Sequence, residues 1–421
     1  MKGGDARVTP DTTAAKTFHV ISVVWGREYL ELFLNTCLPT QLGEGNVPAL
    51  PPGSRYRILT RAADVDEIQR HVTVQALARI IPVDVVAVEA FDEIERADRL
   101  PDARHRDRRF DLVTACNRVG IRDGVAAGAA LLFPSPDYVM SANTFAAIVE
   151  RHRQGYRAVG CVGLRLEKEG FLRSFHASGV PTGAPPAREL VRMAMPHLHA
   201  QTRSLFADAR TFNAYPLGVY WPVGSDGLLG RAFHFHPIMV DPMTASAMPK
   251  LTIDSDYLVK AVPDFTRVHL VTDSDEFIVF ELTEGARSFA SATGTGVALW
   301  RAAAMAARSD RFGIQYWQRG PVFIHGGDVG EQWRGAEASA AKFVRAVMHR
   351  TAPFGTVWPQ WYRWIERAHH LKGRSRRAWR QRVPRLRTKQ IARAVRVARS
   401  RANRVVKRTR KLFANAGALS R

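Results

Sequence analysis

The sequence predicts an α/β fold in which a mostly parallel, twisted sheet is flanked by helices. Two patterns carry this prediction. Apolar, β-branched runs alternate with segments of helical spacing over about the first 150 residues, which is the order found in a doubly wound sheet. Residues 129–133 are wholly apolar and have turn signals at both ends, as expected for a strand that is buried on both faces. The hydrophobic content of 46% is ordinary for a globular protein.

The first elements follow one another from the N-terminus. Residues 1–16 are polar, and we expect them to be disordered. Residues 17–24 form an apolar, β-branched run and predict the first strand, which ends at Trp25–Gly26. Apolar residues at helical spacing predict a helix over 28–42, and the Gly and Pro residues of 43–53 predict a loop.

Two further strands complete the N-terminal part. Residues 55–60 predict the second strand, and a helix is expected over 64–71. Residues 80–88 predict the third strand, with pairing after Pro82 because proline cannot donate a backbone hydrogen bond. The strongly charged segment 91–109 is expected at the surface.

The next stretch contains the first site candidate. A helix over 111–128 leads into the strand 129–133, and a Pro-Ser-Pro-Asp corner leaves Asp137 where that strand ends. A helix from about Ala142 and a strand over 158–166 follow. Open α/β sheets bind ligands at the carboxyl ends of their strands, so Asp137 is a candidate ligand-binding residue. The alternative is that Asp137 only caps the next turn or helix.

Residues 171–350 show a different pattern of predicted strands and helices, and we expect them to form the second half of the same domain. Strands over 267–271 and 276–282 flank Asp273–Ser274–Asp275, which we interpret as a hairpin turn. The remaining expected elements are a long helix over 188–208, strands and turns over 217–241, a helix within 251–262, and helices over 288–308 and 335–349.

The stretch around Asp137 resembles a known family. Cys116–Asn117–Arg118 lie in a helix that ends at Ala126–Ala127–Gly128, the apolar strand follows, and Ser135–Pro136–Asp137 stand at its end. This order resembles the family-2-like nucleotide-diphospho-sugar glycosyltransferases of the GT-A fold, in which such a strand ends in an Asp-x-Asp motif. The loop at Trp25–Gly26 and the second strand, which ends at Thr60–Arg61, also match the order of elements in that family. The resemblance covers about residues 17–170.

The resemblance implies a donor site in residues 17–170 and an acceptor side in residues 171–350. The donor-binding residues that it implies are Trp25, Gly26, Thr60, Arg61, Asn117, Arg118, Ser135 and Asp137. In the family the two aspartates hold a divalent metal that bridges the donor phosphates, so Asp137 is the expected ligand of Mn²⁺ or Mg²⁺. Ser135 departs from the motif, because it replaces the first aspartate. If the metal is lost, Arg61 and Arg118 are placed to offset the phosphate charge.

Further candidates come from the residues themselves. Glycosyl transfer needs a base for the acceptor hydroxyl, and Asp254 and Asp256 are the best pair of carboxylates for this role or for further metal ligation. The alternative is that Asp254 caps a helix. His234 and His236 share one side of an extended strand and could bind substrate phosphate or a metal. A purely structural role is the alternative for both histidines.

The cysteines and the N-terminus suggest a cytoplasmic protein. Cys37, Cys116 and Cys161 are widely spaced in apolar contexts, which fits reduced, buried thiols and gives no metal-binding spacing. The N-terminal residues lack an apolar h-region, so we expect no signal peptide. No uninterrupted apolar stretch approaches the roughly 18–20 residues of a membrane-spanning helix.

The net charge of +22 is concentrated at the C-terminus. Residues 367–421 carry 20 Lys and Arg and no acidic residue, which leaves 41 basic and 39 acidic residues in 1–366. Residues 391–413 place apolar side chains at steps of three and four and predict a cationic amphipathic helix. An aromatic cluster precedes it at Trp358, Trp361, Tyr362 and Trp364.

The segment 351–421 is therefore expected to be an aromatic and basic helical tail. Such a helix lies on an anionic membrane without spanning it, which predicts a peripheral enzyme at the inner membrane face. This enzyme would glycosylate a glycan or lipid-linked acceptor there. The alternatives are a solvated, disordered tail, or binding of nucleic acid through its positive charge, although the tail holds no groove-reading motif. An inactive relative that binds a sugar nucleotide or glycan as a scaffold is a further alternative, supported by Ser135.

Overall fold

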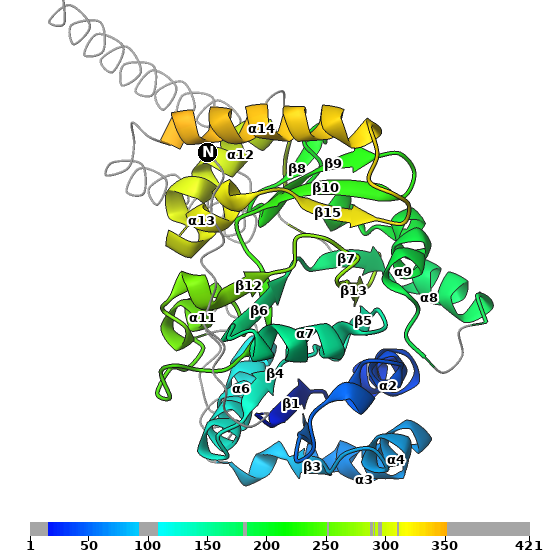
Figure 1. The fold of residues 1–421 in the computed structure, drawn as a ribbon. Coiled ribbons are helices and arrows are strands. Elements are labelled where there is room, and N and C mark those ends of the chain that lie inside the picture. Colours follow the sequence, from blue (N-terminus) through cyan, green and yellow to red (C-terminus); the bar gives the residue numbers. More distant parts are fainter. Residues whose placement is uncertain are drawn as a thin grey trace, which may run out of the picture. The chain divides into compact units, whose positions relative to one another are not determined.

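The computed structural model describes residues 16–351, apart from 92–107, 180–182, 251, 287–288, 290, 294–296 and 310 (Figure 1). The described residues all belong to one compact unit. The basic helix predicted over 391–413 and the aromatic cluster predicted before it lie outside the described residues, and so do residues 1–15 of the N-terminal segment for which disorder is expected. No helix in the described part of the chain is long and apolar enough to cross a membrane.

The core of this unit is a seven-stranded sheet with the order β12-β6-β11-β4-β1-β2-β3. β11 runs antiparallel to its neighbours β4 and β6, and the other pairs are parallel, so the predicted mostly parallel α/β sheet is confirmed. Its strands are β1 (Phe18–Val23), β2 (Arg55–Thr60), β3 (Val83–Ala87), β4 (Ala130–Leu132), β6 (Ala158–Cys161), β11 (His236–Val240) and β12 (Val268–Leu270).

The strand order places a topological switch point between β1 and β4. From β1 the chain adds β2 and then β3 on one side, and it returns to place β4 on the other side of β1. The connections that leave β1 and β4 therefore diverge at their carboxyl ends. Ligands of open α/β sheets bind in the crevice that this divergence opens.

Helices cover the sheet. The run from α1 (Arg27–Leu32) through a π-helical segment, η1 (Phe33–Cys37), to α2 (Leu38–Leu42) is continuous. α6 (Arg108–Ala126) packs on β1 through Gly120, where a Cβ atom would lie 2.8 Å from Ile21 Cγ2. The other helices of this part are α3 (Val65–Arg70), α4 (Val72–Ala78), α7 (Thr144–Arg153) and α8 (Lys168–Ala177), with short 3-10 turns η2 (Val47–Ala49), η3 (Ala62–Asp64) and η4 (Val88–Ala90).

Smaller sheets lie beside the large one. Two of them are three-stranded, with the orders β5-β13-β7 and β15-β10-β9, and β14 pairs with β8. Their strands are β5 (Tyr138–Met140), β7 (Leu164–Glu167), β8 (Thr211–Asn213), β9 (Gly218–Val223), β10 (Gly227–Ala232), β13 (Val279–Thr283), β14 (Ser291–Thr293) and β15 (Val322–His325).

The remaining helices are α9 (Ala187–Ala194), α10 (Ala200–Arg203), α11 (Ser255–Ala261), α12 (Val297–Arg308), α13 (Arg311–Arg319) and α14 (Gln332–Thr351), with 3-10 turns η5 (Met195–His197) and η6 (Phe265–Arg267). Of these, α14 lies along the sheet that contains β9 and β10 (Figure 1).

Four expectations about these elements are wrong. The helix predicted over 288–308 begins only at Val297, and the strand β14 precedes it. The strand predicted over 158–166 is two strands, β6 and β7, which belong to different sheets. The helix predicted over 188–208 is interrupted after Ala194 by the 3-10 turn η5, whose second residue is Pro196. Asp273–Ser274–Asp275 is not a hairpin turn, because β12 and β13 lie in different sheets and Asp273 pairs with Phe323 instead.

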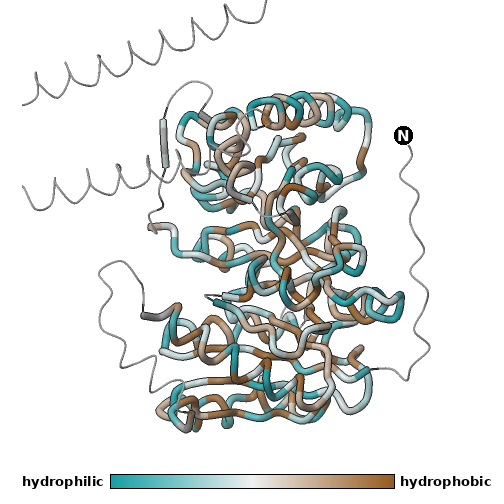
Figure 2. The backbone as a smooth tube through the Cα atoms, turned by 90° about the vertical axis from the view of Figure 1, so that its left-hand side faces the viewer, coloured by the Kyte–Doolittle hydropathy of each residue, from teal (hydrophilic) through white to brown (hydrophobic). Residues whose placement is uncertain are grey.

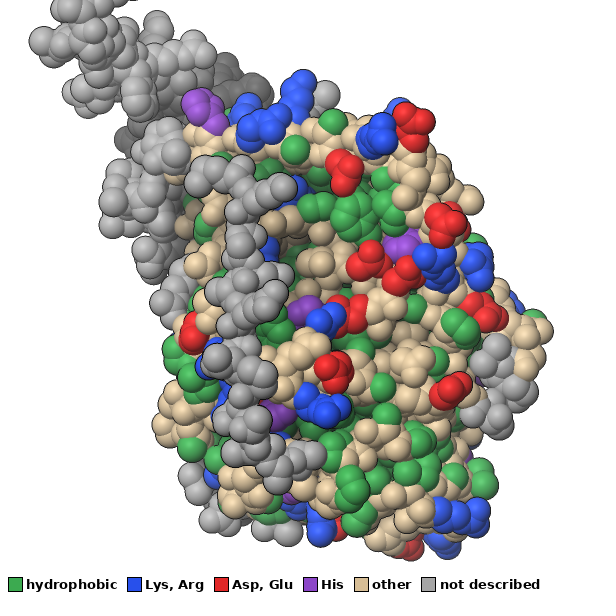
Figure 3. All heavy atoms as spheres, viewed as in Figure 1, with side chains coloured by type: hydrophobic (Ala, Val, Ile, Leu, Met, Phe, Trp, Pro, Cys, Tyr) green, Lys and Arg blue, Asp and Glu red, His purple; other side chains and the backbone are tan. Residues whose placement is uncertain are grey.

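Burial follows the pattern expected from the sequence. Every residue of β1 is buried, and Cys37, Cys116 and Cys161 are free and buried, as predicted for the thiols. In the hydropathy view, apolar segments run through the interior and hydrophilic segments occupy the outer helices (Figure 2). Acidic and basic side chains are interspersed over the face shown in Figure 3, which fits the near balance of charges in residues 1–366.

Candidate functional site

A cavity of ≈ 750 Å³ lies at the carboxyl ends of β1 and β4, at the switch point of the large sheet. This volume is in the range of small-molecule sites in proteins. The predicted site residues that line it are Trp25, Asn117, Ser135, Asp137, His234, His236 and Asp254. The fold thus brings together residues from five separate parts of the sequence.

The corner after β4 holds Asp137 in place. Tyr138 N donates to Ser135 O at 3.1 Å, which closes a β-turn with Pro136 in its second position, where the fixed φ of proline is favoured. Ser135 Oγ donates to Asp137 Oδ1 at 2.5 Å. Ser22 Oγ also donates to Pro134 O at 3.2 Å, which ties the corner to β1. Ser135 therefore orients the carboxylate of Asp137.

The loop after β1 is built around Trp25 and Gly26. Gly26 has φ 81°, a conformation that glycine adopts without strain, and its N–H donates to Asp64 Oδ2 at 2.9 Å. Arg61 Cζ lies 5.9 Å from the centre of the Trp25 ring, and its NH1 lies 3.4 Å from Glu89 Oε1. Gly26, Thr60 and Arg61 are not among the described residues that line the cavity.

Asn117 and Arg118 are neighbours on α6 with different surroundings. Asn117 is 7% exposed and lines the cavity. The guanidinium of Arg118 donates to Pro249 O from Nε at 3.0 Å and from NH2 at 2.8 Å. The structure therefore places Arg118 as an anchor of the loop after β11, outside the cavity lining.

Asp254 and Asp256 are also separated. Asp254 lines the cavity, and its Oδ1 accepts from Asp256 N at 3.0 Å, so it caps α11 as well. Burial raises the pKa of Asp254, and the nearby Asp256 carboxylate adds to this shift. Asp256 instead forms an ion pair with Lys260 at 3.1 Å and does not line the described cavity.

His234 and His236 both line the cavity and contact each other edge to face, with ring centres 5.1 Å apart. Burial, with His236 nearby, lowers the pKa of His234 to about 3, and burial, with Arg165 nearby, lowers the pKa of His236 to about 4. Both imidazoles are therefore neutral near pH 7. A Cβ atom on Gly163 would lie 2.5 Å from His236 Cδ2, so glycine is required where this ring packs.

Arg165 and Glu281 are site residues that were not predicted from the sequence. They are direct neighbours in the register of β7 and β13, form an ion pair at 2.9 Å, and both line the cavity. Glu281 also pairs with Tyr138 across β5, so three polar side chains form one row. A charged residue inside the apolar run of β13 was the available signal, because buried acids almost always have a partner.

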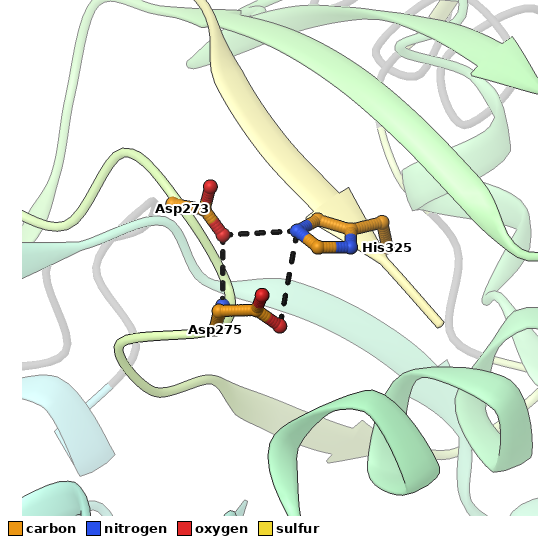
Figure 4. Close-up of side chains that lie close together, drawn as sticks. All are labelled: Asp273, Asp275 and His325. Carbon is orange, nitrogen blue, oxygen red and sulfur yellow. Dashed lines mark hydrogen bonds and ion pairs between the residues drawn. The ribbon is translucent and has the colours of Figure 1, made fainter. Parts of the chain in front are cut away.

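A group that could hold a metal ion lies elsewhere. One ligand atom each from Asp273, Asp275 and His325 lies within 4.8 Å of the other two (Figure 4). None of these residues lines the described cavity. Asp137 belongs to no such group of three within the described residues.

No protein-family model matches the chain, and no curated protein matches it.

Proposed function

We propose that this protein is a glycosyltransferase with a GT-A-like fold, which moves a sugar from a nucleotide-diphospho-sugar to a hydroxyl of a glycan or lipid-linked acceptor. The observation that carries the proposal is the cavity at the β1–β4 switch point, lined by polar residues from the predicted donor and acceptor halves. Its size suits a nucleotide sugar.

The donor would lie between the loop after β1 and the corner after β4. Trp25 offers an aromatic face for the nucleotide base, and Asn117 offers an amide that both donates and accepts. Arg165 is the cation among the described lining residues, and it would offset charge on the diphosphate as the leaving group departs. Glu281 holds this guanidinium in place through the ion pair.

The acceptor hydroxyl would lose its proton to Asp254. A base works best when its pKa is close to the working pH, and burial moves the pKa of Asp254 in that direction. The neutral imidazoles of His234 and His236 can each donate one hydrogen bond and accept another, which suits sugar hydroxyls.

The residues around Asp137 do not by themselves form a complete metal site. Asp137 supplies one carboxylate, whose Oδ1 already accepts from Ser135 Oγ. A Mn²⁺ or Mg²⁺ ion at this corner would have to take its other ligands from the donor phosphates and water. We therefore assign no chemical step to a metal, and the donor experiment is run with and without one.

The donor experiment measures binding and turnover of a panel of nucleotide sugars by the full-length protein, with and without Mn²⁺. We expect one donor to bind at 1:1 stoichiometry and to release its nucleoside diphosphate when an acceptor is present. In the presence of Mn²⁺, Asp137→Ala should weaken donor binding or turnover by about 10-fold or more, because it removes the carboxylate that would help to hold the cation against the donor diphosphate. The exposed Asp208→Ala is the matched control.

Two results would contradict the proposal. Absence of binding by any donor would remove the sugar-nucleotide site altogether. Binding without turnover by any acceptor would favour an inactive, sugar-nucleotide-binding relative. The specific observation behind this second candidate is Ser135, whose hydroxyl occupies Asp137 Oδ1 in place of a second carboxylate.

We further propose that residues 367–421 hold the enzyme at the cytoplasmic face of a membrane, as their 20 positive charges suggest. Each Lys or Arg near an anionic surface contributes about 1 kcal/mol. Full-length protein should therefore sediment with anionic liposomes, whereas a 1–366 truncation should stay in the supernatant. Equal sedimentation of both proteins would refute this role, and preferential capture by DNA at physiological salt would favour nucleic acid instead.

A further inference from the structure

The turn after β12 and the end of β15 are held together by backbone hydrogen bonds. Phe323 N donates to Thr272 O at 2.8 Å, and Ser274 N donates to Phe323 O at 2.8 Å. His325 N donates to Ser274 Oγ at 3.0 Å. These contacts fix the position of His325 relative to Asp273 and Asp275, although His325 and Asp273 are 52 residues apart in sequence.

The imidazole of His325 has a defined orientation. Its Nδ1 lies 2.5 Å from Gly327 O, and because a carbonyl oxygen only accepts, Nδ1 carries the proton of this bond. Nε2 then points at Asp273 Oδ1, 2.9 Å away, and at Asp275 Oδ1, 3.9 Å away (Figure 4). The side chain of His325 is only 3% exposed, so its ring is shielded from water, whereas the two carboxylates remain accessible.

A neutral imidazole in this orientation would direct the Nε2 lone pair at a carboxylate oxygen. Two acceptors at 2.9 Å repel each other unless a proton or a metal cation lies between them. The hydrogen bond from Nδ1 to a backbone carbonyl is also the usual way in which a metal-binding histidine is oriented. The geometry of Nε2 is thus that of a ligand atom.

The charges around His325 favour a cation. Arg188 binds Asp275 through Nε at 2.8 Å and NH2 at 2.7 Å, and binds Asp328 through NH1 at 2.6 Å. Arg188 thus binds two of the three carboxylates of this group, those of Asp275 and Asp328, but not that of Asp273. The guanidinium of Arg192 donates to Gly326 O next to His325, so three carboxylates lie near two guanidinium groups. Each Asp275 oxygen that accepts a hydrogen bond from Arg188 keeps a further lone pair. Arg188 can therefore orient the Asp275 carboxylate while that carboxylate also binds a metal.

We propose that Asp273, Asp275 and His325 form a binding site for a divalent transition-metal ion. One imidazole nitrogen with two carboxylates suits Zn²⁺ or Mn²⁺, whereas Mg²⁺ and Ca²⁺ prefer oxygen ligands throughout. The ion joins the turn after β12 in the large sheet to the end of β15 in a smaller one. The site lies outside the described cavity lining, so it does not depend on the proposed glycosyltransferase activity.

Titration of the chelator-treated, full-length protein with Zn²⁺, Mn²⁺ or Mg²⁺ at pH 7 tests this site by calorimetry. We expect Zn²⁺ and Mn²⁺ to bind at 1:1 and to raise the unfolding temperature, because an ion that binds only the folded state stabilises it. Mg²⁺ should bind at least about 100-fold more weakly. With Co²⁺ as a probe, the visible spectrum should change when His325→Gln removes the nitrogen ligand.

The variants identify the ligands. Asp273→Asn and Asp275→Asn should each weaken Zn²⁺ binding by about 100-fold or more, because each removes an anionic ligand. Asp328→Asn is the matched control, since it removes the same charge and another partner of Arg188 but no ligand. It should keep an affinity within a few-fold of the wild-type value, because it removes a nearby charge but leaves all three ligands in place.

Two results would overturn the proposal. The first is failure of the wild-type protein to bind either Zn²⁺ or Mn²⁺ at 1:1, which would mean that a proton alone joins Nε2 to Asp273. The second is unchanged Zn²⁺ affinity in both Asp273→Asn and Asp275→Asn. These two side chains are 49% and 43% exposed, so the variants should fold even if His325→Gln does not.

Discussion

Asp254→Asn is expected to lower the rate of sugar transfer by about 10²–10⁴-fold, the usual contribution of a general base, while donor binding changes little. Asparagine keeps the oxygen that accepts from Asp256 N, and it is as good a helix cap as aspartate. The substitution therefore removes the base without removing the cap of α11. Steady-state kinetics should show the loss in kcat, with KM for the donor within a few-fold of its wild-type value.

The control for this experiment is the neighbouring carboxylate. Asp256→Asn makes the same chemical change on the same helix, but Asp256 pairs with Lys260 and does not line the described cavity. This variant should keep nearly full activity. If both variants lose activity equally, or if only Asp256→Asn does, then Asp254 is not the base.

Asp241→Asn is expected to destabilise the fold by about 2–3 kcal/mol, because it removes the buried carboxylate that three partly buried basic side chains contact. The Asp241 side chain is 1% exposed, forms ion pairs with Lys16 and, at 2.9 Å, with Arg157, and forms a hydrogen bond of 2.9 Å with His152. These contacts join the chain before β1 to α7 and to the start of β6. Urea unfolding at pH 7 measures the loss.

The pH dependence of this effect gives a second check. Burial by itself would raise the pKa of Asp241, but hydrogen bonds from His152 and Lys16, with Arg157 nearby, hold it below its ordinary value. A lowered pKa means that the carboxylate stabilises the fold above about pH 4 and loses this contribution as the pH falls further. The difference between wild type and Asp241→Asn should therefore shrink below that pH.

A surface carboxylate serves as the control for Asp241. Asp84 pairs with Arg55 at 2.8 Å, and the two side chains are 34% and 45% exposed. Asp84→Asn should cost less than about 1 kcal/mol, as exposed ion pairs do. A similar loss in both variants would mean that burial of Asp241 has no special energetic role.

The sequence predicted the strands of the N-terminal half well. β2 spans Arg55–Thr60, which are the predicted residues, and β3 begins after Pro82 as expected. These predictions succeeded because the signals for a strand are local: alternation of apolar residues, β-branched side chains and proline each influence the backbone within a few residues of their own position. The run over 158–166 failed because its apolar character continues from β6 into β7, although Val162 and Gly163 carry the chain from one sheet to another.

The site was only partly predictable for the same reason. Asp137 could be identified because a strand ends beside it. His234 and His236 both line the cavity, but they do not share a strand as expected, because β11 begins only at His236. Spacing could not tell that Asp254 enters the cavity while Asp256 binds Lys260. That difference depends on the direction in which α11 begins.

By itself, the sequence determined the α/β class, the order of the N-terminal elements and the concentration of positive charge in residues 367–421. Only the tertiary structure decided which polar groups meet. It paired Arg165 with Glu281 across β7 and β13, and it brought His325 to Asp273 and Asp275. The physical reason is that secondary structure follows from spacing along the chain, whereas these contacts follow from strand order and register, which join distant segments without a local signal.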